Sequence, residues 1–217
     1  MIEIPLFPLN MVLFPGMPLQ LHIYEERYKK MVHYCTESDS IFGVVMIESG
    51  QEANGLLSVP KMIGCGAKIT NLEPLSEGRF NLWAVGQQRF EVLELKHDRP
   101  YLVGVVQDYP LRISAQLAAN NSVDYLRPWV ERYLRALGSG DDMERVIQEM
   151  PTDPVVFAYL GAVVLQIPAI QKQPFLEIQE CLALIHQLQI VYRREVALVE
   201  SLLTNKPPAE QGAFSLN

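Results

Sequence analysis

The sequence predicts an α+β protein: a mainly antiparallel β pseudo-barrel with one helix, followed by an α-helical bundle with a long last helix. Two observations predict this order. In the first half, apolar and polar residues alternate, as over Ile63 to Leu72, which is the period of a strand. From about Ser114 the apolar residues recur every three or four positions, which is the period of a helix. We therefore expect a β-rich domain over residues 1–112, a helical domain over 113–204 and a flexible tail over 205–217.

The N-terminal stretch predicts two strands joined by a tight turn. Leu19, Leu21 and Ile23 occupy every second position, as in a strand with one buried face. The preceding Pro15 and Gly16 suit the central positions of a type II turn, where proline presets φ and glycine accepts a positive φ. Downstream, several more short strands contain glycines, which indicates a strongly bent sheet that closes on itself. We expect a half-open barrel of about six strands.

A helix is predicted directly after the second strand, over residues 25–37. Tyr24, Tyr28, Met31 and Cys35 are spaced so that they form one stripe of a helix, which we expect to pack at the mouth of the barrel. After Phe90 and Val92 the alternation changes phase by one residue, which indicates a β-bulge.

Prolines mark the expected helix boundaries in the second half. Pro128 either kinks a helix or lies in its first turn, and both interpretations are open. Asp153 followed by Pro154 is typical of a helix N-terminus. The helix that follows, over 155–166, is apolar nearly all round, so we expect it to be buried. The long last helix is expected to begin after Pro174.

Composition and charge exclude several classes of function. The 217 residues are 49% hydrophobic and 20% charged, as in globular proteins that bury a core. The net charge of −7 is spread evenly: residues 1–110 carry 9 basic and 13 acidic residues (−4), and residues 111–217 carry 9 and 12 (−3). Because neither half concentrates basic residues, we do not expect nucleic-acid binding as the main activity.

The cysteines and the apolar runs point to a cytoplasmic protein without membrane association. Cys35, Cys65 and Cys181 are odd in number and lack C-x-x-C spacing, so reduced thiols are expected and neither a disulfide framework nor a zinc site. No secretory signal is visible. The longest apolar run, 155–165, is shorter than the roughly 20 residues that a membrane-spanning helix needs.

The sequence contains none of the common catalytic motifs. The phosphate-binding pattern G-x-x-x-x-G-K-[ST] and the patterns H-E-x-x-H and G-x-S-x-G are all absent, and the four histidines are scattered. We therefore expect no catalytic residues, no metal and no cofactor.

Residues 5–28 resemble the opening of the N-terminal, substrate-binding domain of Lon proteases. They carry the pattern P-L-F-P-L-N-x-V-L-F-P-G-x-x-L-x-L-x-I-x-E-x-R-Y. Residues 63–69 are similar to the family's V-G-T-x-A-x-I strand, with Cys65 in place of threonine. Lys172 and Gln173 are similar to the family's K-Q before its last helix, although Pro174 departs from the usual leucines. The ATPase region and the Ser-Lys protease region of Lon have no counterpart in these 217 residues.

The resemblance implies a PUA-like barrel and a non-catalytic module that binds exposed apolar or unfolded polypeptide segments in protein quality control. Its implied partners are disordered protein segments, and a protease or chaperone. The candidate binding residues are Phe14, Pro15, Met17, Pro18, Tyr24 and Arg27. Phe14 and Met17 form either an exposed apolar tip or a plug tucked over the barrel end. The alternatives to polypeptide binding are RNA binding, as in other PUA-like barrels, and a small-ligand or enzymatic barrel.

Overall fold

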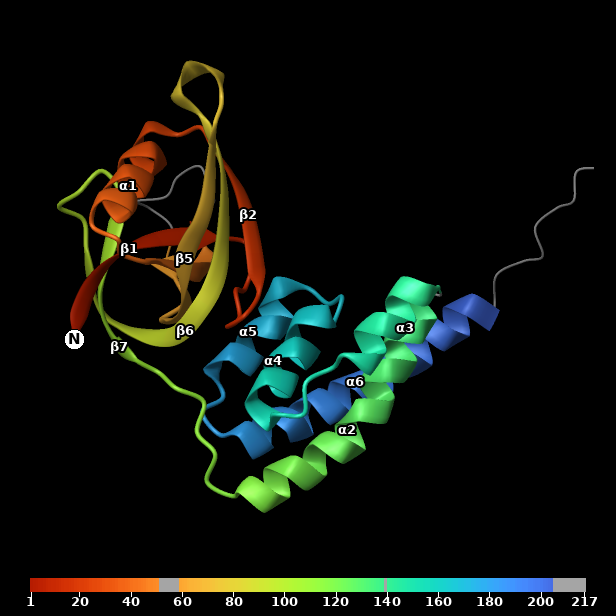
Figure 1. The fold of residues 1–217 in the computed structure, drawn as a ribbon. Coiled ribbons are helices and arrows are strands. Elements are labelled where there is room, and N and C mark those ends of the chain that lie inside the picture. Colours follow the sequence, from red (N-terminus) through yellow and green to blue (C-terminus); the bar gives the residue numbers. More distant parts are fainter. Residues whose placement is uncertain (51–58, 139, 205–217) are drawn as a thin grey trace, which may run out of the picture.

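The computed structural model describes residues 1–50, 59–138 and 140–204, so the tail predicted over 205–217 lies outside the described residues (Figure 1). Within this part, strands and one helix form a barrel, and the other helices pack beside it. The strands are β1 (Ile2–Leu9), β2 (Pro18–Ile23), β3 (Phe42–Ser49), β4 (Val59–Pro60), β5 (Ile63–Pro74), β6 (Phe80–Lys96) and β7 (Leu102–Asp108). The helices are α1 (Glu26–Glu37), α2 (Gln116–Leu137), α3 (Asp141–Gln148), α4 (Pro154–Val164), α5 (Ala169–Glu177) and α6 (Cys181–Thr204). The predicted α+β class is confirmed.

The sheet closes on itself, as predicted from its glycines. Its strand order is β1-β7-β6-β5-β3-β4, and β1 also pairs with β3. This closing pair is parallel, whereas the other pairs are antiparallel. β2 lies outside this path and pairs with the first half of β6. The predicted bulge is confirmed, because the register between β6 and β7 shifts between Val92 and Glu94.

Glycines make room for a large ring inside the barrel. A Cβ added to Gly43 would lie 2.5 Å from Cζ of Phe90, and one added to Gly64 would lie 2.7 Å from the same atom. Neither position therefore accepts a larger residue without displacement of the ring. Phe90 belongs to a cluster of buried apolar side chains, which consists of Ile4, Leu6, Val45, Phe90, Val92, Leu102 and Val106.

Helix α1 lies beside the barrel (Figure 1) and packs on a second apolar cluster, to which β1, β2, β3, β5, β6 and β7 contribute side chains. Tyr28, Met31 and Cys35 are buried, as their spacing predicts. The predicted extension of this stripe to Tyr24 is wrong. Tyr24 precedes the helix and is 60% exposed, since the extended backbone of Glu25 turns it away from the helical face.

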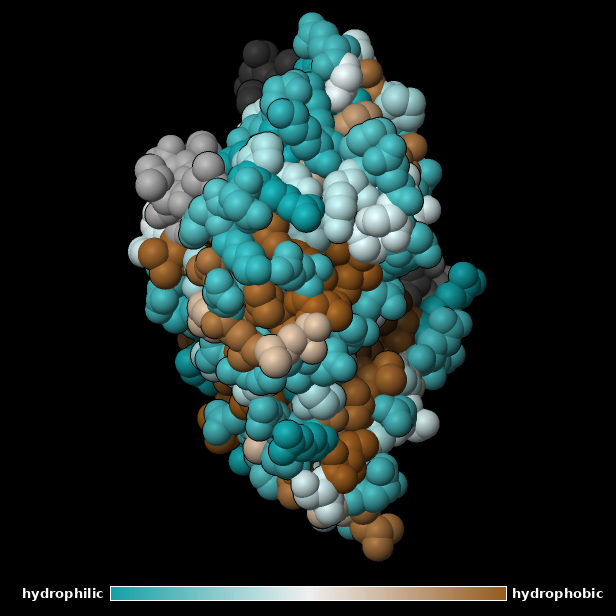
Figure 2. Space-filling model, turned by 90° about the vertical axis from the view of Figure 1, so that its left-hand side faces the viewer, coloured by the Kyte–Doolittle hydropathy of each residue, from teal (hydrophilic) through white to brown (hydrophobic). Residues whose placement is uncertain are grey.

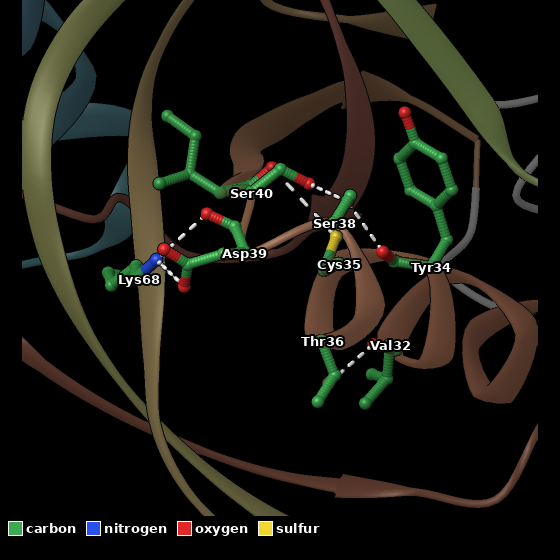
Figure 3. A network of polar contacts seen from close by, with 9 residues as sticks. Val32, Tyr34, Cys35, Thr36, Ser38, Asp39, Ser40 and Lys68 are labelled. Atoms are coloured by element: carbon green, nitrogen blue, oxygen red, sulfur yellow. Dashed lines mark hydrogen bonds and ion pairs between the residues drawn. The ribbon is translucent and has the colours of Figure 1, made fainter.

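Polar contacts hold the C-terminal end of α1 against β5 (Figure 3). Ser38 Oγ donates to the carbonyl of Tyr34 at 2.6 Å and exchanges a hydrogen bond with Ser40. Lys68 Nζ, from β5, donates to the carbonyl of Asp39 at 2.9 Å and pairs with its carboxylate. The Tyr34 carbonyl also accepts the backbone N–H of Ser38 at 3.1 Å, so Ser38 closes the helix with both its side chain and its backbone.

In the helical half, α2 and α6 pack along each other, with α4 against both. The rings of Tyr133 and Tyr192 meet edge to face, with centroids 5.4 Å apart. The hydroxyl of Tyr192 donates to the carbonyl of Gly161 at 2.7 Å, which links α6 to α4. Pro128 lies inside α2, so the interpretation that placed it in a first turn is wrong.

The last helix begins later than predicted, at Cys181 instead of directly after Pro174. Pro174 lies inside the short helix α5. The chain then leaves the helical conformation, because Arg112 N donates to the carbonyl of Gln179 at 2.7 Å and Cys181 N donates to the carbonyl of Arg112 at 2.9 Å. These hydrogen bonds use backbone groups of Gln179 and Cys181 that a continuous helix would bond internally. α6 has 24 residues, which corresponds to about 36 Å.

Asp153 caps α4, as predicted. One of its carboxylate oxygens accepts from the backbone N–H of both Val155 and Val156, at 2.9 Å each. Replacement by alanine leaves these donors without a side-chain partner. We expect Asp153→Ala to lower the free energy of unfolding by about 1 kcal/mol, measured by urea denaturation. Asp153→Asn keeps an accepting oxygen and should lose less; an equal loss in both variants would contradict the capping role.

Candidate functional site

The turn between β1 and β2 is held firmly against β6. Met17 N donates to the carbonyl of Phe14 at 3.0 Å and Gly16 has a φ of +78°, which confirms the predicted type II turn. Gly16 N donates to the carbonyl of Gly86 at 2.8 Å, and Gly86 N donates to that of Met17 at 2.9 Å. A Cβ on Gly86 would lie 2.2 Å from the carbonyl oxygen of Phe14, so only glycine allows this approach.

The turn divides its apolar side chains between the core and the surface. Phe14 is fully buried, with its ring centroid 6.4 Å from that of Tyr159 on α4. The interpretation of an exposed apolar tip is therefore wrong for Phe14, because its ring belongs to the core shared by the barrel and the helices. Pro15 and Met17 are partly exposed, and Pro18 is exposed. These three remain available to a partner.

A groove lies between this turn and α4. It consists of two adjoining hollows that share Pro15, Gly16 and Val156, with volumes of about 390 Å³ and 260 Å³. We name them the Arg89 hollow and the Leu160 hollow. The first is also lined by Gln87, Gln88, Arg89, Pro110, Leu111, Val155 and Tyr159. The second is also lined by Met17, Pro18, Pro151, Leu160 and Val163.

Helix α4 is therefore not buried on every side, contrary to the prediction from its composition. Phe157, Ala158 and Ala162 are buried, but Val156 is 53% exposed and Leu160 is partly exposed. An all-apolar helix gives no sequence signal for the side that faces a groove. The open side lies against the turn, and it supplies one apolar wall.

Arg89 is the charged residue of this groove that the sequence analysis did not identify. It is only 2% exposed, and its Nη1 donates to the carbonyls of Leu176 at 2.7 Å and Ile178 at 2.6 Å. Its guanidinium also lies 5.3 Å and 5.8 Å from the ring centroids of Tyr109 and Tyr159. Burial lowers the pKa of the guanidinium. The sequence contains only one sign of this role, namely that Arg89 directly precedes the apolar Phe90 in β6.

Tyr24 and Arg27, the other two predicted binding residues, lie elsewhere. Tyr24 lines a smaller hollow of about 150 Å³ with Leu21, His22 and Glu25 at the C-terminal end of β2. The groove begins at the N-terminal end of the same strand, so the structure does not bring the six predicted residues together. Arg27 pairs with Glu25 at 2.6 Å, and its guanidinium lies 4.5 Å from the ring centroid of Tyr28.

Apolar surface is present outside the groove as well. Seen from the barrel side, hydrophobic residues gather in the middle of a face that is otherwise mainly hydrophilic (Figure 2). Ile2 on β1 and Leu93 on β6 are exposed apolar residues of the barrel strands. The groove differs from scattered residues of this kind because its walls come from two parts of the fold and enclose a volume.

The acidic, histidine and cysteine side chains of the described residues form no metal-binding cluster, and the three thiols are buried. Across residues 1–50, 59–138 and 140–204, no group of three His, Cys, Asp or Glu side chains could hold a metal ion. Burial raises the pKa of the Cys35 and Cys181 thiols to about 11 and that of Cys65 to about 12. These thiols stay protonated near neutral pH, so they are poor nucleophiles.

Lys172 and Gln173 have a structural explanation. Lys172 Nζ donates to the carbonyl of Val163 at 2.9 Å, in the last turn of α4. Gln173 is buried and donates to the carbonyl of Ile63 at 3.0 Å, at the start of β5. The two side chains thus connect α5 to α4 and to the barrel.

Comparison with known proteins identifies the family. Residues 3–191 match the family described as the ATP-dependent protease La (LON) substrate-binding domain. The chain is 26% identical over 183 residues to the Lon protease of Anaeromyxobacter dehalogenans (strain 2CP-C), covering 82% of this chain and 21% of that protein. It is 30% identical over 109 residues to Lon protease 2 of Myxococcus xanthus, and this match covers 48% of this chain and 13% of that protein. The chain thus spans about a fifth or less of the length of these proteases.

Two solved structures share the fold. The Lon N-terminal domain protein from Xanthomonas campestris covers 95% of this chain and 100% of its own, with a TM-score of 0.60 and 23% identity. The match to the N-terminal domain of the Mycobacterium avium complex Lon protease covers 90% of this chain and 98% of that structure, with a TM-score of 0.68 and 13% identity. In the part of this chain that the structure describes, no helix is long and apolar enough to cross a membrane. The chain belongs to the LON substrate-binding domain family.

Proposed function

We propose that this protein is a non-catalytic recognition module that binds exposed apolar segments of unfolded polypeptides in the groove between the Pro15–Pro18 turn and α4. The observation that carries this proposal is the apolar wall of the groove. Val156, Leu160 and Val163 line it from the helix, and Met17 lines it from the turn. Membership of a substrate-binding family supports the same kind of ligand.

The groove suits such a ligand physically. An apolar segment that enters it removes side chains such as Val156 from water, which favours association. The turn is stiffened by two prolines and by its hydrogen bonds to Gly86, so it loses little conformational entropy on binding. A disordered ligand must itself be ordered, and this cost limits the affinity. We therefore expect micromolar dissociation constants.

The charge of the groove favours a polypeptide over RNA. Among its lining residues Arg89 is the one basic side chain, and it is buried. RNA binding commonly uses several exposed cations along the phosphate backbone. We further propose that the protein hydrolyses neither peptide bonds nor ATP, that it acts in the cytoplasm, and that a protease or chaperone receives the segments it binds.

The test of the proposed function is the affinity for an unfolded reporter polypeptide, measured by fluorescence anisotropy. The double variant Met17→Ser/Val156→Ser removes one apolar side chain from each wall. We expect its affinity to fall about tenfold, because each lost apolar contact contributes about 1 kcal/mol or somewhat less. Its far-UV circular dichroism and melting temperature are recorded beside those of the wild type.

A matched control changes apolar surface outside the groove. Ile190 and Leu198 on α6 are 61% and 50% exposed, comparable with Val156. The double variant Ile190→Ser/Leu198→Ser should bind the reporter as the wild type does. Equal losses in both variants would show general apolar adhesion, and no loss in the groove variant would reject the groove.

A further inference from the structure

We propose that the Arg89 hollow receives the C-terminal carboxylate of the bound polypeptide, with the last apolar side chain of that polypeptide against the walls of the hollow. This inference rests on the proposed function. It adds a chemical preference, because a segment that ends in a free carboxylate should bind more tightly than an internal apolar segment. The argument depends on the unmatched charge of Arg89.

The hydrogen bonds of Arg89 are incomplete. Nη1 has its two carbonyl acceptors, whereas Nε and Nη2 are buried without a hydrogen-bond partner in the described residues. The side chains that face the guanidinium are Tyr109, Tyr159 and the thiol of Cys65. None of these is a carboxylate, and the lining of the hollow contains neither Asp nor Glu.

A carboxylate is the group that completes such a site. A buried cation without an anionic partner is costly, and a guanidinium presents its N–H groups in a fork that fits the two oxygens of a carboxylate. The low polarity of the surrounding walls strengthens the attraction. Because the guanidinium is covered in the unbound protein, the side chains around it must rotate on binding, as interface side chains commonly do.

The shape of the groove favours a chain end over an acidic side chain. The two hollows meet at Pro15, Gly16 and Val156, so a segment that lies along the Leu160 hollow continues into the Arg89 hollow. A volume of about 390 Å³ holds a terminal residue with its apolar side chain and carboxylate together. Val156, which is exposed, belongs to the lining that the two hollows share.

The first test compares two forms of one short, unstructured peptide that ends in Leu-Val: the free acid and the C-terminal amide. We expect the acid to bind the wild-type protein about tenfold more tightly, since a charge-assisted hydrogen-bond pair is lost in the amide. Equal binding of both forms would overturn this inference and leave the proposed function standing. Binding of neither form would overturn both.

A third peptide separates the two sources of a carboxylate. It is the amide with glutamate in place of the last valine. If it binds as tightly as the free acid, Arg89 recognises acidic side chains and the preference for a chain end is wrong. We expect it to bind no better than the plain amide.

A protein variant tests the location without removing Arg89. Val156 occupies the third position of α4, where both Glu and Gln are well tolerated. Val156→Glu places a carboxylate in the lining of the Arg89 hollow and should reduce the acid-to-amide affinity ratio to near one. Val156→Gln removes the same valine without adding charge, so its ratio should stay about tenfold. A ratio that is the same in both variants would overturn the inference.

Discussion

Phe14→Ala is expected to lower the free energy of unfolding by about 3–5 kcal/mol, the cost of removing a fully buried aromatic side chain. Phe14 is fully buried in the cluster that joins the barrel to α4, α5 and α6, and its ring lies near that of Tyr159. The cavity left behind cannot collapse easily, because the turn is fixed to Gly86 by two hydrogen bonds. Urea denaturation followed by circular dichroism measures the loss.

The matched control is Met17→Ala in the same turn. Met17 is only partly buried, so its removal should cost about 1 kcal/mol. A loss for Phe14→Ala that is as small as this would mean that the ring is not part of the shared core. The pair of variants separates the structural half of the turn from the half that lines the groove.

Arg89→Met is expected to lower the free energy of unfolding by about 2–4 kcal/mol, although no carboxylate pairs with Arg89 among the groups that face it. The methionine fills similar space but leaves the carbonyls of Leu176 and Ile178 without their charged donor. These carbonyls lie where α5 ends, so the connection to α6 should loosen as well. Thermal and urea denaturation both report the change.

Arg89→Lys retains the charge with a single donor group and should lose less than Arg89→Met. If Arg89→Met is as stable as the wild type, relief from burying a cation compensates for the lost hydrogen bonds. The stabilising role assigned to Arg89 would then be wrong, and ligand binding would be the remaining reason for a cation in this position.

Local features of this fold could be predicted from the sequence because they depend on neighbouring residues. Pro15 and Gly16 determine their own turn type, and Asp153 caps the helix that directly follows it. Glycines inside the strands, such as Gly64 and Gly104, indicate a strongly bent sheet by their presence alone, and the sheet closes on itself. Each of these predictions is confirmed.

Features that depend on distant contacts were missed or wrong. The last helix starts at Cys181 because the backbone of Arg112, far away in the sequence, forms hydrogen bonds with the backbone of Gln179 and Cys181. The burial of Phe14 depends on Tyr159, and the exposure of Val156 depends on where the turn lies. The role of Arg89 likewise becomes visible only when α5 ends beside β6. Hydrophobic periodicity contains none of this information.

The most direct test of the central claim, that the groove binds polypeptide, is a map of methyl chemical shifts during titration with the unfolded reporter. Met17, Leu160 and Val163 line the groove, whereas Leu21 and Ile23 line the smaller hollow beside Tyr24. We predict that the methyl signals of the first three shift progressively and saturate at the dissociation constant found by anisotropy. Saturating shifts at Leu21 and Ile23, with Met17, Leu160 and Val163 unchanged, would contradict the account.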